Sequence, residues 1–140
     1  FPLSQFAIDG YSSPFRLDRN SCGGGIMLFI PDYLLCKKID LSGSFHNIEA
    51  MFIEIKVRNT KWLIVAGYNP RKENISYFLS HISKGLDNIL AKYEHFLILG
   101  DFNAQMSENA MIDFCDLYDL ENLINVSLVS KILVIHHRLM

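Results

Sequence analysis

A carboxylate and a carboxamide lie two residues apart in the segment FLILGDFNA, residues 96–104. Asp101 can accept a proton, and Asn103 can donate hydrogen bonds without adding negative charge. Tyr68, which follows a second apolar run, adds a phenol that donates in the same way. We therefore expect these three side chains to form a ligand site. The plainer alternative is that Asp101, Phe102 and Asn103 only form a turn, because Asp and Asn favour turns.

Two short apolar runs must position these side chains. Residues 96–99 form a continuous apolar run ended by Gly100, which is typical of a strand buried on both faces. Residues 62–67 form a second strand candidate. Between them, the N-cap candidate Asn74 precedes apolar residues spaced by three and four, which predicts an amphipathic helix. If these elements form one right-handed crossover, the strands are parallel and the polar side chains meet at the carboxyl end of the sheet, where α/β sheets bind ligands.

The apolar positions of this predicted helix are Ile75, Phe78, Leu79, Ile82, Leu86, Ile89, Leu90 and Tyr93. Further strands are expected upstream, at residues 26–30 and 34–39. Residues 48–57 alternate in polarity and pair with residues 61–68 as an antiparallel hairpin across a short turn. Residues 1–20 are predicted to be loop.

Three other segments allow alternative interpretations. The glycines at 23–25 could suggest a phosphate-binding loop, but the Lys-Ser/Thr pair and the following helix of such a loop are missing, so we favour a strand. Ser107 is a candidate cap for a second helix that buries Met111, Phe114, Cys115 and Tyr118. From Leu123 onward the chain is either an extra edge strand or a tail.

Composition fits one globular domain of 140 residues, because half of the residues are apolar and 20% are charged. The formal net charge is -2, which gives no overall attraction to nucleic acid, so binding would need a local basic patch. The basic residues considered for such a patch are Arg16, Arg19, Lys37, Lys38, Arg71 and Lys72.

Cysteine and histidine usage points to no metal or disulfide framework. Cys22, Cys36 and Cys115 are widely spaced, which suits a reducing compartment and predicts no disulfide partner. His46, His81 and His95 are isolated, and we expect surface or capping roles for them. The adjacent pair His136 and His137 makes a poor metal site, because neighbouring side chains on a strand point to opposite faces.

The ends and hydropathy of the chain bear on its location. The first residues contain no basic n-region and no apolar h-region of a secretory signal, and no apolar run approaches the roughly 20 residues that cross a bilayer. We therefore expect no membrane partner and an intracellular protein, either nuclear or cytoplasmic. The chain begins with Phe1 in place of an initiator Met, which predicts that it is part of something longer.

Several motifs in this order are similar to one known family. ILGDFNA resembles the core motif of the endonuclease/exonuclease/phosphatase superfamily, which includes the abasic-site endonucleases and DNase I. The succession RLDRNSCGGGIMLFIP, IEAMFIEI, WLIVAGYNP, a helix and FLILGDFNA resembles in particular the endonuclease domain of LINE-type (non-LTR) retrotransposon polyproteins. The resemblance covers residues 1–124 and leaves residues 125–140 as a divergent tail.

The resemblance implies an α/β (α+β) fold, a partial four-layer α/β/β/α sandwich of the DNase I-like type. It also implies phosphodiester hydrolysis with Mg²⁺ (or Mn²⁺), DNA as the substrate, and a reverse transcriptase segment in the parent polyprotein. Carried over to this sequence, Asp101 orients or deprotonates the attacking water, Asn103 supports the nucleophile and phosphate, and Tyr68 lines the site and contacts the phosphate. These types suit the reaction, because a phosphodiester attacked by water gains negative charge in its transition state.

The chain also departs from the family pattern. The family's first strands bring an asparagine and a metal-binding glutamate, and its end brings a Ser-Asp-His motif; nothing in this sequence matches either. Glu49 and Glu54 lie outside the matching motif and are not assigned the glutamate's role, so Asp101 is the one metal-ligand candidate. We therefore expect a chain incomplete at both ends with little or no activity, because groups that act as a unit fail together.

Two further hypotheses and one stability expectation remain. The chain could be a non-catalytic remnant that binds nucleic acid or protein, or a phosphatase of the same superfamily acting on a phosphorylated lipid or small molecule. The DRN-GGG segment and the GYNP form of the tyrosine strand disfavour the phosphatase. Unpaired sheet edges and an exposed apolar face predict aggregation or the need for a partner segment.

Overall fold

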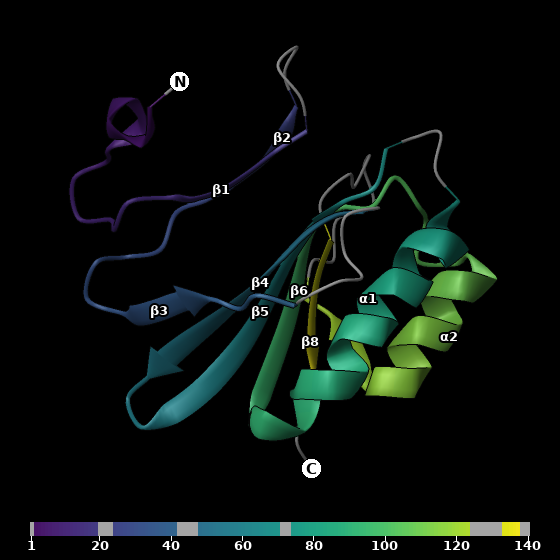
Figure 1. The fold of residues 1–140 in the computed structure, drawn as a ribbon. Coiled ribbons are helices and arrows are strands. Elements are labelled where there is room, and N and C mark those ends of the chain that lie inside the picture. Colours follow the sequence, from purple (N-terminus) through teal and green to yellow (C-terminus); the bar gives the residue numbers. More distant parts are fainter. Residues whose placement is uncertain (1, 20–23, 42–47, 71–73, 124–132, 138–140) are drawn as a thin grey trace.

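The computed structural model describes residues 2–19, 24–41, 48–70 and 74–123, together with the backbone of residues 133–137. The chain forms a mixed α/β structure (Figure 1). Its elements are η1 (Leu3–Phe6), β1 (Phe15–Asp18), β2 (Gly25–Leu28), β3 (Leu35–Lys38), β4 (Glu49–Val57), β5 (Thr60–Tyr68), α1 (Ile75–Ile89), η2 (Leu90–Lys92), β6 (His95–Asp101), α2 (Asn109–Tyr118), β7 (Leu120–Asn122) and β8 (Leu133–His137).

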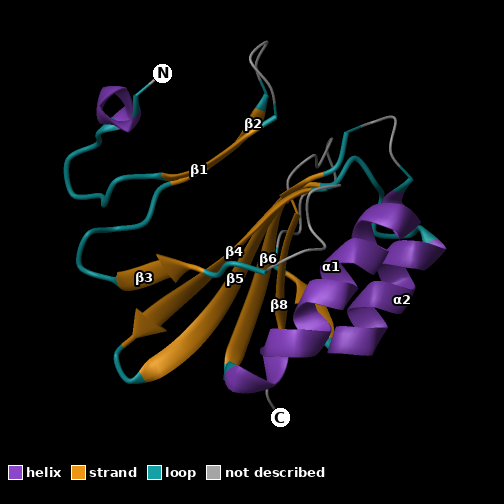
Figure 2. Ribbon diagram, viewed as in Figure 1, coloured by secondary structure: helices purple, strands orange, loops and turns teal. Residues whose placement is uncertain are grey.

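These elements form layers. The main sheet has six strands in the order β3-β4-β5-β6-β8-β7, and β1 and β2 form a separate antiparallel pair. Helices α1 and α2 lie together on one face of the main sheet, and the β1–β2 pair lies away from them (Figures 1 and 2). The described residues thus supply a helix layer, the main sheet and part of a second sheet, which agrees with the expected DNase I-like sandwich.

Two apolar clusters fill the space on either side of the main sheet. The larger one joins α1 and α2 to the sheet through residues such as Phe78, Leu63 and Phe96. The smaller one joins β1 and β2 to the other face through Met51 and Ile53. Strand β6 packs against the helices on one face and has partly buried residues on the other. Its predicted burial is therefore complete on the helix face and partial on the opposite face.

The strand–helix–strand unit that carries the predicted site is confirmed. The β4–β5 pair is an antiparallel hairpin, and β5 and β6 are parallel neighbours. Asn74 caps α1, because its side-chain oxygen accepts a hydrogen bond from the backbone N–H of Ser76 at 2.8 Å. The helix ends at Ile89 instead of continuing to residue 93, and the 3₁₀ turn η2 follows it.

Three sequence predictions were wrong in their local detail. The 1–20 segment contains η1 and the four-residue strand β1, whose Phe15 and Leu17 pack on the smaller apolar cluster. Helix α2 has Glu108 as its N-cap residue and not Ser107, whose hydroxyl donates a 3.4 Å hydrogen bond to the Gln105 side chain in the preceding turn. Strand β8 is not an edge strand, because it pairs with both β6 and β7.

Candidate active site

The predicted site residues lie at the ends of two neighbouring parallel strands. Tyr68 is the last residue of β5 and Asp101 the last of β6, and the two are register partners. The backbone N–H of Asn69 donates to the carbonyl of Asp101 at 2.8 Å, so the ladder continues one step beyond the strands. The structure thus brings Tyr68, Asp101 and Asn103 to one end of one sheet.

A close approach of two glycines allows this arrangement. Gly67 and Gly100 are register partners just before Tyr68 and Asp101. Gly100 has φ +149°, and a Cβ atom there would lie 1.8 Å from the carbonyl oxygen of Gly67. No side chain can occupy position 100 without moving the strands apart, so Gly100 fixes the turn that follows it against β5.

The turn after β6 is held by three hydrogen bonds. The backbone N–H of Asn103 donates to Oδ1 of Asp101 at 3.2 Å, which is the local turn that Asp favours. Nδ2 of Asn103 donates to the carbonyl of Asn69 at 2.6 Å, and Nδ2 of Asn69 donates to the carbonyl of Phe102 at 3.0 Å. Asn103 has φ +47°, a conformation that Asn tolerates better than most residues.

Asn69 is a site residue that the sequence reasoning missed. It is only 1% exposed, and it receives one bond from Asn103 and returns one to the adjacent turn. The signal was present in the GYNP segment, but a residue before proline at a strand end is usually explained as a turn former. We find that it braces the Asp101–Asn103 turn against β5.

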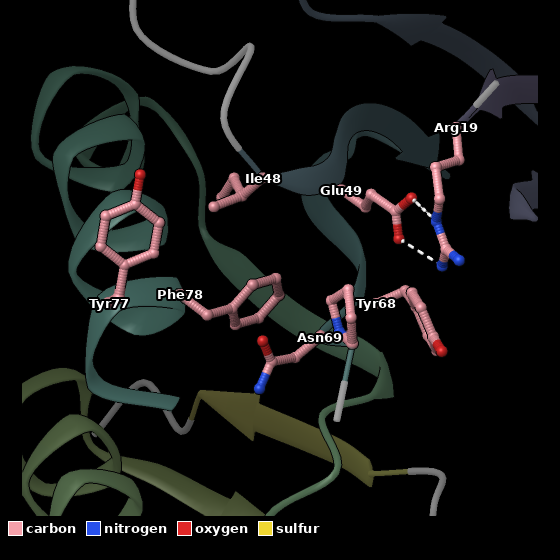
Figure 3. Close-up of a pocket in the computed structure, with 8 residues that line it drawn as sticks. Arg19, Ile48, Glu49, Tyr68, Asn69, Tyr77 and Phe78 are labelled. Atoms are coloured by element: carbon pink, nitrogen blue, oxygen red, sulfur yellow. Dashed lines mark hydrogen bonds and ion pairs between the residues drawn. The ribbon is translucent and has the colours of Figure 1, made fainter. Parts of the chain in front are cut away.

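A second group of polar side chains gathers beside Tyr68. Glu49 is the first residue of β4 and the register partner of Tyr68 in the antiparallel pair. Arg19, which follows β1, binds both carboxylate oxygens of Glu49, with its Nη2 at 3.0 Å from Oε2 and its Nε on Oε1 (Figure 3). The guanidinium carbon also lies 4.9 Å from the centre of the Tyr68 ring. We call these three residues the arginine cluster.

The charges of the arginine cluster are well defined. The hydrogen bond to Glu49 is the main cause that raises the pKa of Arg19 above its usual range, followed by the one to Tyr68. An arginine side chain is protonated in any case, so the site has a permanent positive charge on the face of Tyr68. Such stacking of a guanidinium on an aromatic ring is favourable, because the ring face is electron-rich.

A cavity of about 220 Å³ opens between the arginine cluster and the start of α1 (Figure 3). Its apolar wall comes from Ile48, Pro70, Tyr77 and Phe78, and its polar wall includes Asn69 and the arginine cluster. Asp101 and Asn103 do not line it. The site therefore has two adjoining parts, the braced turn of 101–103 and this cavity, with Tyr68 and Asn69 between them.

The described residues do not complete a metal site. No group of three or more His, Cys, Asp or Glu side chains among them could hold a metal ion. Asp101 offers one carboxylate, whereas the Glu49 carboxylate is engaged by Arg19. Mg²⁺ binds through one or two carboxylates together with water and substrate phosphates, so Asp101 alone is a partial ligand set.

The structure describes only some of the other basic, cysteine and histidine residues that the sequence singled out. Lys37 and Lys38 line a separate depression with Lys61 and Lys92, so the proposed basic residues do not form one patch in the part of the chain described. Arg71 and Lys72 fall outside the described residues, as do Cys22, His46 and the side chains of His136 and His137. Cys36 and Cys115 are free thiols.

Two histidines have packing roles. His81 is buried within α1, where its Nδ1 lies 2.9 Å from the Tyr77 carbonyl and its ring packs on the Tyr77 ring, so the expected surface or capping role was wrong. The ring of His95 stacks on Trp62 at 4.3 Å, at the opposite end of β5 and β6 from Tyr68 and Asp101. Among the described helices, none has the length and apolar character needed to span a membrane.

Comparisons with known proteins place this fold. No protein-family model matches the chain, and no curated protein matches it. Several solved structures are similar to it. The endonuclease domain of TRAS1, a telomere-specific non-LTR retrotransposon, matches 89% of this chain and 67% of its own chain, with a TM-score of 0.66 and 12% identity. The catalytic domain of human Nocturnin with a bound sulfate anion matches 97% and 62%, with a TM-score of 0.68 and 16% identity.

Another similar structure, D. rerio TDP2 humanized by 14 mutations, matches 91% of this chain and 58% of its own, with a TM-score of 0.54 and 9% identity. The chain therefore spans between 58% and 67% of the length of these solved chains. At such low identities the likeness concerns the fold. The chain shares the fold of these solved structures, which is the DNase I-like fold that the sequence resemblance implied.

Proposed function

We propose that this chain belongs to an endonuclease-type domain that hydrolyses phosphodiester bonds, with DNA as the substrate. The observation that carries the proposal is the register pairing of Tyr68 with Asp101, with Asn103 braced beside them. The likeness of the fold to the TRAS1 endonuclease domain supports the same class of reaction. A parent retroelement polyprotein that also contains a reverse transcriptase remains a prediction from the sequence resemblance.

Each of the three residues has a chemically suitable role. The half-buried Asp101 carboxylate accepts the proton of the attacking water, since Asn103 holds only one of its oxygens. Asn103 uses one N–H for Asn69 and has a second N–H for a phosphate oxygen. The Tyr68 phenol is a further neutral donor. Neutral donors suit this reaction, because the phosphate gains negative charge as water attacks.

We further propose that these 140 residues have little or no activity on their own. Mg²⁺ or Mn²⁺ belongs to the proposed reaction by resemblance, yet the described residues provide only Asp101 as an uncommitted carboxylate near the site. The sequence also has no match to the terminal histidine motif of the family. When several members of a catalytic unit are missing, the remaining ones restore little of the rate.

Nicking of supercoiled plasmid tests the proposal, with Mg²⁺ and with EDTA, in a sample whose fold is verified by circular dichroism. We expect at most slow nicking that needs the metal and disappears in Asp101→Ala. Asp113→Ala, an exposed aspartate on α2, is the matched control and should leave the rate unchanged. Nicking that survives Asp101→Ala would refute the assigned site. Rapid metal-dependent nicking would refute the claim of impairment.

The incomplete metal ligand set among the described residues favours one alternative, a non-catalytic module that binds nucleic acid or protein. In that case Asp101→Ala and Asn103→Ala leave binding unchanged, or Asp101→Ala strengthens DNA binding because a negative charge is removed. Measuring DNA affinity and nicking on the same samples separates the two functions.

A further inference from the structure

We propose that Arg19 is a substrate-contacting residue and that Glu49 positions it: the guanidinium, held on the face of Tyr68, binds a phosphate of the nucleic-acid strand next to the cleaved bond. The inference rests on the proposed function, since it assigns a second phosphate-binding group to the same site. Arg19 and Glu49 are separate from Asp101 and Asn103, the two residues of the 101–103 turn to which the proposed function assigns the chemistry.

The position of Arg19 follows from strand register. Glu49, Tyr68 and Asp101 form one row across β4, β5 and β6 at the same end of the sheet. Neighbouring strands are about 4.8 Å apart. Arg19 binds the first residue of that row and stacks on the second, so its charge lies beside the proposed reaction centre.

The guanidinium has donors to spare for a ligand. It carries five N–H groups in a fixed fork. Glu49 takes the one on Nε and one on Nη2, and Tyr68 accepts a further bond, which leaves N–H groups for a ligand. The Arg19 side chain is 37% exposed, whereas the Glu49 side chain is 15% exposed, so the ion pair faces solvent from the arginine side. Arginine forks match phosphate oxygens well, which is why arginine is common in phosphate recognition.

Gly24 leaves space for the side chain of Arg19. A Cβ atom on Gly24 would lie 3.0 Å from both the guanidinium carbon and Nη1 of Arg19, and Gly24 has φ +87°. Gly24 of the DRN-GGG pattern therefore has a physical role, because a residue without a side chain accommodates the arginine against Glu49 and Tyr68. An ion pair with an exposed arginine adds little to stability, so a ligand can share the Arg19 donors at little cost to the fold.

Arg16 provides a matched control. It also forms an ion pair with a neighbouring carboxylate, Asp18, at 2.6 Å, and it also lies over an aromatic ring, that of Phe6, at 5.5 Å. However, it does not line the cavity beside Tyr68. A general effect of removing one positive charge from this part of the chain should therefore appear equally in Arg16→Gln and Arg19→Gln.

The test is the salt dependence of DNA affinity, measured by fluorescence anisotropy with a labelled duplex in EDTA. The slope of log affinity against log salt becomes shallower by about 0.9 for each phosphate that the protein no longer neutralises. We expect Arg19→Gln to reduce the slope by about 0.9, Arg19→Lys to retain it, and Arg16→Gln to leave it unchanged. Circular dichroism of each variant establishes that the fold is intact, and Arg19→Lys remains informative if Arg19→Gln fails to fold.

The role of Glu49 is tested by a double-mutant cycle on DNA affinity. If Glu49 positions Arg19, Arg19→Gln costs less affinity in a Glu49→Gln background than in the wild type. If Glu49 only repels DNA, its removal raises affinity by the same factor with or without Arg19, which overturns the positioning role.

The outcomes also separate this inference from the proposed function. Wild-type DNA binding together with equal slopes for wild type and Arg19→Gln, or equal reductions for Arg16→Gln and Arg19→Gln, would overturn the Arg19 assignment alone. A wild-type chain that is folded and does not bind DNA would refute the proposed function and this inference with it.

Discussion

The turn at residues 101–103 and the arginine cluster lie at the same end of the sheet, and both depend on β5, but they are held in different ways. Backbone groups fix the turn: its bonds involve the carbonyls of Asn69, Asp101 and Phe102, and Asn69 is almost fully buried. In the cluster, Arg19 contacts Glu49 and Tyr68 through its side chain, which is exposed. The turn is thus part of the hydrogen-bonded framework of the sheet, whereas the contacts of Arg19 are made by an exposed side chain.

This difference predicts which substitutions affect stability and which affect ligand binding. Buried hydrogen-bonded groups are costly to disrupt, because the remaining partner loses its bond away from water. Exposed ion pairs contribute little to folding, because both charges are already well solvated in the unfolded chain. Changes in the turn should therefore lower the free energy of unfolding, and changes in the cluster should alter DNA affinity with little effect on folding.

The largest expected effect is that of Gly100→Ala. The added methyl group would lie 1.8 Å from the Gly67 carbonyl oxygen, so β5 and β6 must separate where the turn begins. We expect a loss of more than about 4 kcal/mol in the free energy of unfolding, measured by urea denaturation, or failure to fold. Gly10→Ala is the matched control, because Gly10 also has positive φ (+84°) but has no atom within 4 Å of the added Cβ; its cost should be about 1 kcal/mol.

Asn103→Ala should have the next largest effect. It removes the hydrogen bond to the Asn69 carbonyl and places alanine at φ +47°, for an expected loss of about 2 kcal/mol in the free energy of unfolding. Asn103→Gly loses the same bond without the backbone strain, so it should cost less than Asn103→Ala. If glycine proves at least as destabilising as alanine, the left-handed backbone is not what makes this position demanding.

A smaller effect is expected at the second carboxylate of β4, Glu54, whose partner is partly buried. The Tyr93 hydroxyl donates to Oε2 of Glu54 at 2.7 Å, and this bond is the main cause that lowers the pKa of Glu54, with Lys37 and Lys61 assisting. Tyr93→Phe should cost about 1 kcal/mol at pH 7.

The pH dependence of that cost has a definite sign. Because the folded pKa of Glu54 is lowered, its contribution is present above the unfolded value of about 4.3 and is lost as the pH falls through the folded value. Denaturation at pH 7 and at pH 2 should therefore give a difference between wild type and Tyr93→Phe that shrinks in acid. A difference that stays constant would show that the hydroxyl acts by packing and not through the carboxylate charge.

The smallest stability effect is expected for Glu49→Gln. This substitution keeps the size of the side chain and removes the charge that Arg19 binds. The urea midpoint should stay close to that of the wild type, although DNA affinity changes as described above. A large loss of stability would mean that the arginine cluster is as much a part of the fold as the turn at residues 101–103, and the two regions would no longer differ in the way proposed.

The sequence predicts the two regions unequally for a physical reason. The turn follows a buried strand and is formed by residues close in sequence, so the FLILGDFNA pattern and the helix before it were sufficient to place Asp101, Asn103 and Tyr68 together. The arginine cluster joins residues 30 and 49 positions apart, counted from Arg19 to Glu49 and to Tyr68. Its assembly depends on where the short strand β1 packs, and hydrophobic periodicity cannot reveal a four-residue strand among turn signals.

The same limit explains the other errors. Strand β8 lies inside the sheet, although its sequence follows no pattern set by the elements before it. Pairing of distant strands is decided by tertiary packing, which local propensity does not encode. The β4–β5 hairpin and helix α1, apart from the end of the helix, were predicted correctly, because each is specified by contacts within a few turns or across one tight turn.

Two-dimensional ¹H–¹⁵N NMR of the chain, titrated with a short DNA duplex in EDTA, tests the central claim most directly. The claim is that the end of the sheet carrying Tyr68 and Asp101 binds the phosphodiester backbone, and the measurement does not depend on catalytic activity. We predict the largest shifts at the amides of Tyr68, Asn69 and Asn103, with the Trp62 indole at the far end of β5 unchanged. Shifts centred on Trp62, with the 68–69 and 101–103 amides unmoved, would contradict the account.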